Sequence, residues 1–160
     1  MKSANYVLVR IGFCAALLAN AQESVRFEAT VDGLNRAVEA VYTKSSLPTR
    51  GKSAAVVLMH SAGGSRDGTT GPLAKALNAS GIASLEIQLF VNPFTRPMVE
   101  KTPTVDFEAL KYLNGKAEID GDRIGIAGCS YGGLASLWTA TKWMTESYDA
   151  GLKFAAHAPI

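Results

Sequence analysis

The chain has 160 residues, of which 48% are hydrophobic and 19% are charged. This length suffices for one domain with its own core, and the balance of residues excludes an intrinsically disordered chain. The formal net charge is +2, from 16 basic and 14 acidic side chains.

The first 21 residues are typical of an export signal. A basic start is followed by an apolar run at residues 11–18, and the Ala-Asn-Ala triplet at 19–21 has the small-x-small pattern that precedes cleavage. The run is too short for a stable membrane anchor. A buried N-terminal helix is the alternative. We expect residues 1–21 to be a signal peptide, residues 22–160 to form one domain, and the protein to be exported to a periplasm or to the medium.

The expected cleavage changes the charge and the cysteine count. It removes Lys2 and Arg10 and no acidic residue, which leaves 14 basic and 14 acidic side chains. A net charge of zero does not indicate nucleic acid as a partner. Cys129 is then the one remaining cysteine, so no internal disulfide is expected. No His or Cys cluster has metal-ligand spacing, and we expect neither a metal nor another cofactor.

Two alternating segments follow the expected signal. Residues 25–31 and 36–44 place apolar side chains at every second position, as half-buried strands do. Asp32 and Gly33 between them are a turn signal. We expect an antiparallel hairpin at the edge of a sheet.

The remaining segments predict alternating strands and helices. Buried strands are expected at residues 54–60, 82–87 and 123–128, because these runs are apolar without alternation. Helices are expected from Pro72 to Gly81, from Pro103 to Gly115 and over residues 131–148, with a fourth parallel strand over 152–160. This order predicts an α/β fold with right-handed crossovers and a doubly wound, mostly parallel sheet, whose site lies at the carboxyl ends of the strands.

One turn in this pattern carries a recognisable motif. Residues 128–132, GCSYG, match G-x-S-x-G between an expected strand and an expected helix. A serine nucleophile at such a turn has a strained backbone, and Gly128 and Gly132 would avoid clashes with the neighbouring strand and helix. Gly133 extends this close packing. We predict that Ser130 is a nucleophile; the alternative is a tight turn with a structural serine.

An oxyanion hole is expected beside the same turn. The free amides at the N-terminus of the expected helix favour negative charge, and the Tyr131 amide is the predicted first donor. The second donor is expected from the glycine-rich loop after residues 54–60, where Ala62 is our choice. Gly63 and Gly64 would let this loop approach the substrate closely.

These motifs resemble the α/β-hydrolases of the dienelactone hydrolase group. The resemblance rests on AAVVLMHSAGG at residues 54–64, on DGDRIGIAGCSYGG at residues 120–133 and on their spacing, and it covers most of the chain after the signal. The prolyl-oligopeptidase-like peptidases share a similar G-x-S-Y-G-G turn. Dienelactone hydrolases carry a cysteine nucleophile, so Ser130 at that position implies a general serine esterase. Ser61 stands where the family usually has glycine, which bears on the shape of the oxyanion loop.

A serine nucleophile needs a base and a carboxylate that orients it. The resemblance implies the chain order Ser, acid, His, with both partners after later strands than any present, so the fold is expected to be C-terminally incomplete. The residues available after Ser130 are Glu146, Asp149 and His157. His157 is expected to be a buried strand residue, and Asp149 to lie at the wrong end of the sheet. The resemblance gives His60 the role of shaping the oxyanion loop.

Three further side chains follow the serine turn, and two cations precede the second expected helix. Trp138, Trp143 and Met144 are expected in the core. Arg96 and Lys101 would suit an acidic substrate, with plain solvation as the alternative.

We therefore expect a serine hydrolase that acts on a small ester, lactone or related small-molecule acyl substrate. Two alternatives stay open. The first is a non-catalytic hydrolase fragment or binding module that retains the serine turn, and the second is a fragment of a prolyl-oligopeptidase-like peptidase. An incomplete sheet would leave an unpaired edge and an uncovered apolar face, so self-association is an expected property.

Overall fold

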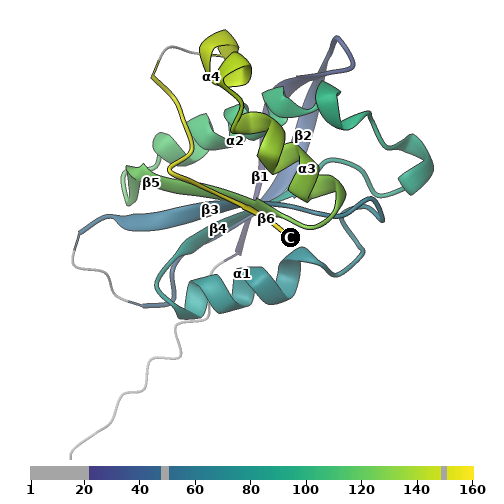
Figure 1. Cartoon of the computed structure of the whole chain (residues 1–160). Coiled ribbons are helices and arrows are strands. Elements are labelled where there is room, and N and C mark those ends of the chain that lie inside the picture. Colours follow the sequence, from purple (N-terminus) through teal and green to yellow (C-terminus); the bar gives the residue numbers. More distant parts are fainter. Residues whose placement is uncertain (1–21, 48–50, 149–150) are drawn as a thin grey trace, which may run out of the picture.

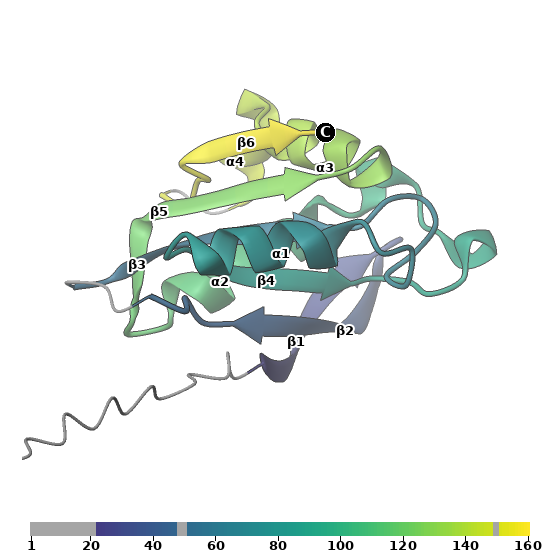
Figure 2. The same cartoon turned by 90° about the horizontal axis from the view of Figure 1, so that it is seen from below.

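A six-stranded sheet with helices on both faces forms the protein (Figures 1 and 2). The computed structural model describes residues 22–47, 51–148 and 151–160. The strands are β1 (Gln22–Val31), β2 (Leu34–Thr43), β3 (Ser53–Met59), β4 (Ala83–Gln88), β5 (Ile119–Gly128) and β6 (Ala156–Pro159). The helices are α1 (Thr70–Ala79), α2 (Pro103–Asn114), α3 (Tyr131–Thr139) and α4 (Lys142–Tyr148), with short 3₁₀ turns η1 (Pro93–Thr95) and η2 (Val99–Lys101). The signal-peptide prediction for residues 1–21 lies outside the described residues.

The strand order confirms the predicted α/β architecture. The sheet runs β1-β2-β4-β3-β5-β6, with parallel pairing from β4 through β3 and β5 to β6. β1 and β2 form the expected antiparallel hairpin at one edge. Its turn has positive φ at both Asp32 (53°) and Gly33 (75°), as a two-residue hairpin of type I′ requires. The carboxyl ends of β3 and β5 therefore lie side by side.

The helices divide between the two faces of the sheet. α1 lies on one face, and α2, α3 and α4 lie on the other (Figures 1 and 2). Side chains of the central strands are buried on both faces, because both are covered by helices. Val57, Leu85 and Ile126 belong to the larger core under α2 and α3, whereas Leu58 and Ala127 pack under α1. The apolar, non-alternating strands of the sequence thus fill two layers of packing.

Several element boundaries differ from the predicted ones. α1 begins two residues before Pro72, while Gly81 has φ 85° just past the helix, as a C-terminal glycine should. The predicted single helix over residues 131–148 is wrong: it breaks between α3 and α4. Thr141 stands at the break, and its Oγ1 accepts a hydrogen bond from Met144 N at 3.4 Å, so the polar side chain starts a new helix.

The fourth parallel strand is shorter than predicted and has exposed side chains. β6 covers residues 156–159 rather than 152–160, and within the described chain it pairs only with β5, so it forms the second edge of the sheet. An apolar hollow of about 420 Å³ lies beside α1, between Leu58, Leu73, Ala127 and Ile160 among others. The described part of the chain thus has the open edge and the partly uncovered apolar face that the sequence predicts.

An exposed apolar strip follows the outer side of α3. Leu134, Leu137 and Trp138 are 58%, 48% and 39% exposed. The prediction that Trp138 belongs to the core is wrong, because α3 turns this side chain away from the sheet. Met144 in α4 is buried as predicted. No helix within the described ranges is long and apolar enough to cross a membrane.

Candidate active site

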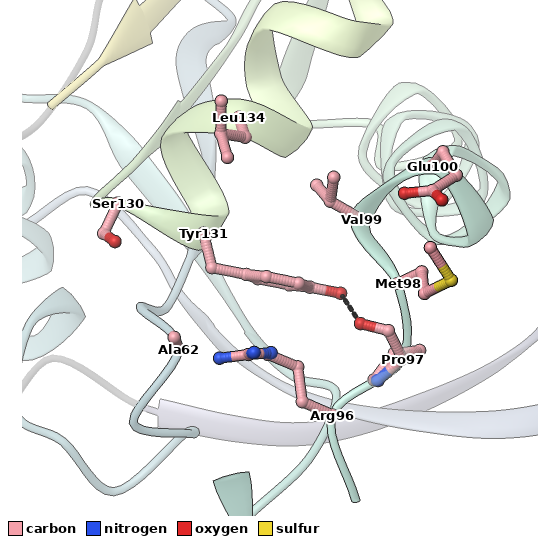
Figure 3. Close-up of a pocket in the computed structure, with 9 residues that line it drawn as sticks. All are labelled: Ala62, Arg96, Pro97, Met98, Val99, Glu100, Ser130, Tyr131 and Leu134. Carbon is pink, nitrogen blue, oxygen red and sulfur yellow. Dashed lines mark hydrogen bonds between the residues drawn. The ribbon is translucent and has the colours of Figure 1, made fainter. Parts of the chain in front are cut away.

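Ser130 stands at the tip of the turn between β5 and α3. Its backbone has φ 53° and ψ −107°, a strained conformation for a residue with a side chain. The side chain is exposed and lies at the edge of a pocket (Figure 3). Strain of this kind persists only where the surrounding structure enforces it.

Glycines enforce this geometry through backbone contacts. A Cβ added to Gly128 would lie 2.4 Å from the backbone of Gly132, across the turn. A Cβ added to Gly132 would lie 2.4 Å from Met59 O, at the end of β3. Gly133 is less crowded, at 3.1 Å from Gly128 O. The turn can therefore close, and pack against β3, only with glycine at positions 128 and 132.

Hydrogen bonds tie the turn to the end of β6. Ser130 N donates to Ile160 O, and Ile160 N donates to Gly128 O, each at 2.8 Å. Leu134 N donates to Ser130 O at 2.9 Å and continues the helix. Tyr131 N, at the start of α3, has no hydrogen-bond acceptor within the part of the chain that the structure describes. This amide is available to a negative charge beside Ser130.

The loop after β3 faces the serine across the pocket. Ala62, in this loop, lines the same pocket as Ser130 and Tyr131 (Figure 3). Gly64 has φ 98°, and a Cβ there would lie 2.5 Å from Val91 O. A Cβ on Gly63 would lie 2.9 Å from Asp67 Cβ. These two glycines allow close packing of the loop against other protein segments, and the close approach to substrate that the sequence analysis expects stays a prediction.

Asp67 organises this loop, and sequence reasoning missed it. Its carboxylate accepts hydrogen bonds from both the amide and the hydroxyl of Ser61, and from both the amide and the hydroxyl of Thr69. Partial burial opposes its ionisation, but these hydrogen bonds together lower the pKa of Asp67. The available signal was an Asp flanked by hydroxyl residues in a loop with several glycines.

His60 is fully buried behind the loop. Its Nδ1–H donates to Ser61 O over 2.9 Å, which fixes the proton on Nδ1, and burial lowers the pKa of the ring. The ring packs edge-on against Phe90, with centroids 4.5 Å apart, and Phe90 packs in the same way against Tyr131 at 5.5 Å. These contacts match a supporting role for His60, and no hydrogen bond joins it to Ser130 in the described residues.

The pocket at Ser130 has a volume of about 400 Å³. Burial raises the pKa of Tyr131 to about 12, and its hydroxyl donates to Pro97 O at 2.9 Å. The guanidinium of Arg96 lies over the same ring, 5.8 Å from its centroid. Figure 3 shows the ring between the side chains of Leu134 and Val99 on one side and that of Arg96 on the other. The pocket is lined by Ala62, Arg96, Pro97, Met98, Val99, Glu100, Ser130, Tyr131 and Leu134.

No base or acid partner for Ser130 is found in residues 22–47, 51–148 and 151–160. His157 lies in β6 and is half-buried rather than buried, with its ring 5.8 Å from that of Phe154. Glu146 pairs with Lys142 on the exposed side of α4. Asp149 lies outside the described residues. Cys129 is free and half-buried.

Nor do the described residues hold a metal-binding group. No three His, Cys, Asp or Glu side chains lie together within these ranges in a way that could bind a metal ion.

Comparisons with known proteins place the fold. The prolyl oligopeptidase family (Peptidase_S9) matches residues 101–160, and the comparison with curated proteins gives no match. The solved acetyl xylan esterase from Paenibacillus sp. R4 is 18% identical with a TM-score of 0.60, over 77% of this chain and 45% of that chain. Esterase 2 of Thermogutta terrifontis, phosphoramylated by tabun, is 16% identical with a TM-score of 0.59, over 83% of this chain and 53% of that chain.

A third solved structure points to the same fold. A Klebsiella pneumoniae protein described as a dienelactone hydrolase is 15% identical with a TM-score of 0.57, over 77% of this chain and 56% of that chain. The chain spans about half the length of these three solved structures. Its architecture is that of the α/β-hydrolases.

Proposed function

Because the chain has the α/β-hydrolase fold, we propose that it belongs to a serine hydrolase of small esters, lactones or related acyl compounds, with Ser130 as the nucleophile. The observation that carries this proposal is the strained backbone of Ser130 at the pocket edge. A structural serine gains nothing from φ 53°, whereas a nucleophile gains a hydroxyl that projects from the turn.

The chemistry follows from the groups that face the pocket. Ser130 Oγ would add to the carbonyl carbon of the substrate while its proton passes to a base, and the carbonyl π electrons move to oxygen. The amides of Tyr131 and Ala62 would donate to that oxyanion. Collapse of the tetrahedral species expels the alcohol, which takes up a proton, and water then releases the acid from the acyl-enzyme.

The shape of the pocket supports a small substrate. About 400 Å³ holds a compact acyl group, and Val99, Met98 and Leu134 give it apolar walls. The names of the neighbours support the reaction class, since they include two esterases and a dienelactone hydrolase. The prolyl oligopeptidase match over residues 101–160 favours a peptidase as the second candidate.

Active-site labelling tests the proposal. We expect a fluorophosphonate probe to add one label to the protein and Ser130→Ala to abolish it, since phosphorylation needs an activated serine. Cys129→Ser is the matched control and should keep the label. Intact mass spectrometry measures the result. Absence of any label would favour the alternative of a non-catalytic hydrolase fragment or binding module, in which the serine turn persists without its chemistry.

Substrate panels separate the two enzyme candidates. A labelled protein that cleaves short aryl esters and no peptide amide would favour the esterase. Cleavage of a prolyl peptide substrate in preference to esters would favour the peptidase.

Export and self-association are further parts of the proposal. Export would be tested by sequencing the N-terminus of the protein recovered from outside the cytoplasm, where a start at Gln22 is expected. Self-association through the open sheet would appear as a concentration-dependent rise in sedimentation coefficient, whereas a constant monomer value would contradict it.

A further inference from the structure

Four hydrogen bonds converge on the carboxylate of Asp67. Oδ2 accepts from Ser61 N at 3.1 Å and from the Ser61 hydroxyl. Oδ1 accepts from Thr69 N at 2.9 Å and from Thr69 Oγ1 at 2.7 Å. Both oxygens are thus occupied, and the carboxylate joins the end of β3 to the start of α1. We call Ser61, Asp67 and Thr69 the Asp67 cluster.

This cluster sets the path of the chain through Ala62. The Ser61 hydroxyl donates to Asp67 and accepts from Gly63 N at 3.1 Å, so this side chain holds the peptide between Ala62 and Gly63 and ties it to the carboxylate. The contact of Gly63 with Asp67 Cβ leaves no room for a side chain there. The peptide that carries the Ala62 amide is thus held from its Ser61 side by Asp67. The carbonyl oxygen of the same peptide also accepts from His60 Nδ1 at 2.9 Å and from Gly64 N at 3.2 Å.

A second anchor holds the far side of the loop. Ser65 N donates to Phe90 O at 2.8 Å, and Gly64 packs against Val91 O. This anchor fixes where the loop lies relative to the segment after β4. It does not touch Ala62, so the orientation of that peptide is left to the Asp67 cluster and to the two hydrogen bonds that the Ser61 carbonyl accepts.

The charge of Asp67 excludes a direct catalytic part. A carboxylate near a developing oxyanion repels it, so a direct electrostatic effect would slow the reaction. Its two oxygens are also saturated by donors from the protein, which leaves no lone pair directed at a base. Asp67 can therefore help the reaction only by holding the loop in position through its hydrogen bonds.

We propose that Asp67 and Ser61 are positioning residues that hold the Ala62 amide toward the oxyanion at Ser130. This inference rests on the proposed function of Ser130 as a nucleophile. Asp67→Asn would replace one acceptor oxygen with a donor amide, so either the Ser61 pair or the Thr69 pair of bonds is lost.

The first test is the rate of fluorophosphonate labelling. We expect Asp67→Asn, Ser61→Ala and Thr69→Val each to lower the second-order rate constant, with the Asp67 variant about 10-fold or more slower. Thr69→Ser keeps the hydroxyl and should restore most of the rate relative to Thr69→Val. Asp120→Asn is the matched control, because Asp120 also accepts from a side chain and an amide but stands at the opposite end of β5.

Stability measurements separate positioning from folding. Urea midpoints of all variants should stay high enough that the folded fraction is unchanged under the labelling conditions. A labelling loss that follows the loss of folded protein would overturn the inference. So would an Asp67→Asn rate equal to that of the wild type, and in that case the proposed function would still stand.

A second measurement does not depend on activity. Amide hydrogen exchange at Gly63 should accelerate in Asp67→Asn, because the Ser61 hydroxyl that accepts from Gly63 N loses its own acceptor. Unchanged exchange at Gly63 would overturn the inference whatever the labelling result. If the wild type takes no label and Gly63 still exchanges faster in Asp67→Asn than in the wild type, the proposed function fails while Asp67 still orders the loop.

Discussion

Gly132 in α3 lies directly against the carbonyl oxygen of Met59 in β3, so that a Cβ on the glycine would come within 2.4 Å of that oxygen. The contact joins the serine turn to the strand that leads into the Ala62 loop. It sets how closely the serine turn approaches that loop.

Gly132→Ala should therefore be strongly destabilising. The new methyl group meets backbone on β3, which cannot move without disturbing the central sheet, and we expect a loss of about 3 kcal/mol in the free energy of unfolding. Gly71→Ala is the control, since its Cβ has nothing within 4 Å in α1. That variant should gain about 0.5–1 kcal/mol. Urea unfolding gives both values, and equal effects would contradict the steric argument.

Backbone strain at Ser130 predicts an unusual order of stabilities. Ser130→Gly should be about 1 kcal/mol more stable than Ser130→Ala, because glycine adopts φ 53° without steric cost while alanine keeps the strain. The same two substitutions at Ser80, whose φ is −94°, should show no advantage in stability for glycine over alanine. Chemical denaturation of the four variants checks this, and a less stable Ser130→Gly would show that the turn is unstrained.

Asp106 predicts a pH dependence of stability. This carboxyl group in α2 is fully buried, neither oxygen has a partner in the described residues, and burial raises its pKa well above the ordinary value. Below the unfolded-state pKa, about 3.9, the group is protonated in both states, and its ionisation does not lower the free energy of unfolding. As pH rises above that value, the unfolded state releases its proton first, so the folded state loses stability until the pH passes the raised pKa.

Asp106→Asn removes this dependence. The variant should be about 1–3 kcal/mol more stable than the wild type at pH 7, and the difference should vanish near pH 4. Exposed Asp122→Asn serves as the control and should show no such trend. Urea midpoints measured at several pH values test the sign. A wild type that becomes more stable than Asp106→Asn with rising pH would contradict burial as the dominant effect.

Tyr131 links the site to the segment that forms the pocket wall. Tyr131→Phe removes the hydrogen bond to Pro97 O and should cost about 1 kcal/mol, while the ring under Arg96 remains. Alkaline titration followed by phenolate absorbance should lose one group with a pKa of about 12 in this variant. If the lost group titrates near the ordinary tyrosine pKa of about 10 instead, the ring is not buried as described.

The sequence predicted the type of most elements and missed details that depend on contacts between distant segments. The break between α3 and α4 depends on one threonine within a segment whose pattern is helical throughout. Exposure of Trp138 could not be predicted, since an apolar side chain at helical spacing is usually buried. The half-buried state of His157 reflects an edge strand, and edge position is decided by which strands pair.

By itself the sequence determined the α/β class, the hairpin, the strand-turn-helix at Ser130 and the glycines that it needs, because each depends on local periodicity or on backbone sterics within a few residues. Only the tertiary structure decided that Gly64 packs against Val91 and that Asp67 accepts four hydrogen bonds from Ser61 and Thr69. These relations join the ends of different strands and helices, and such contacts form only when the sheet brings those ends together.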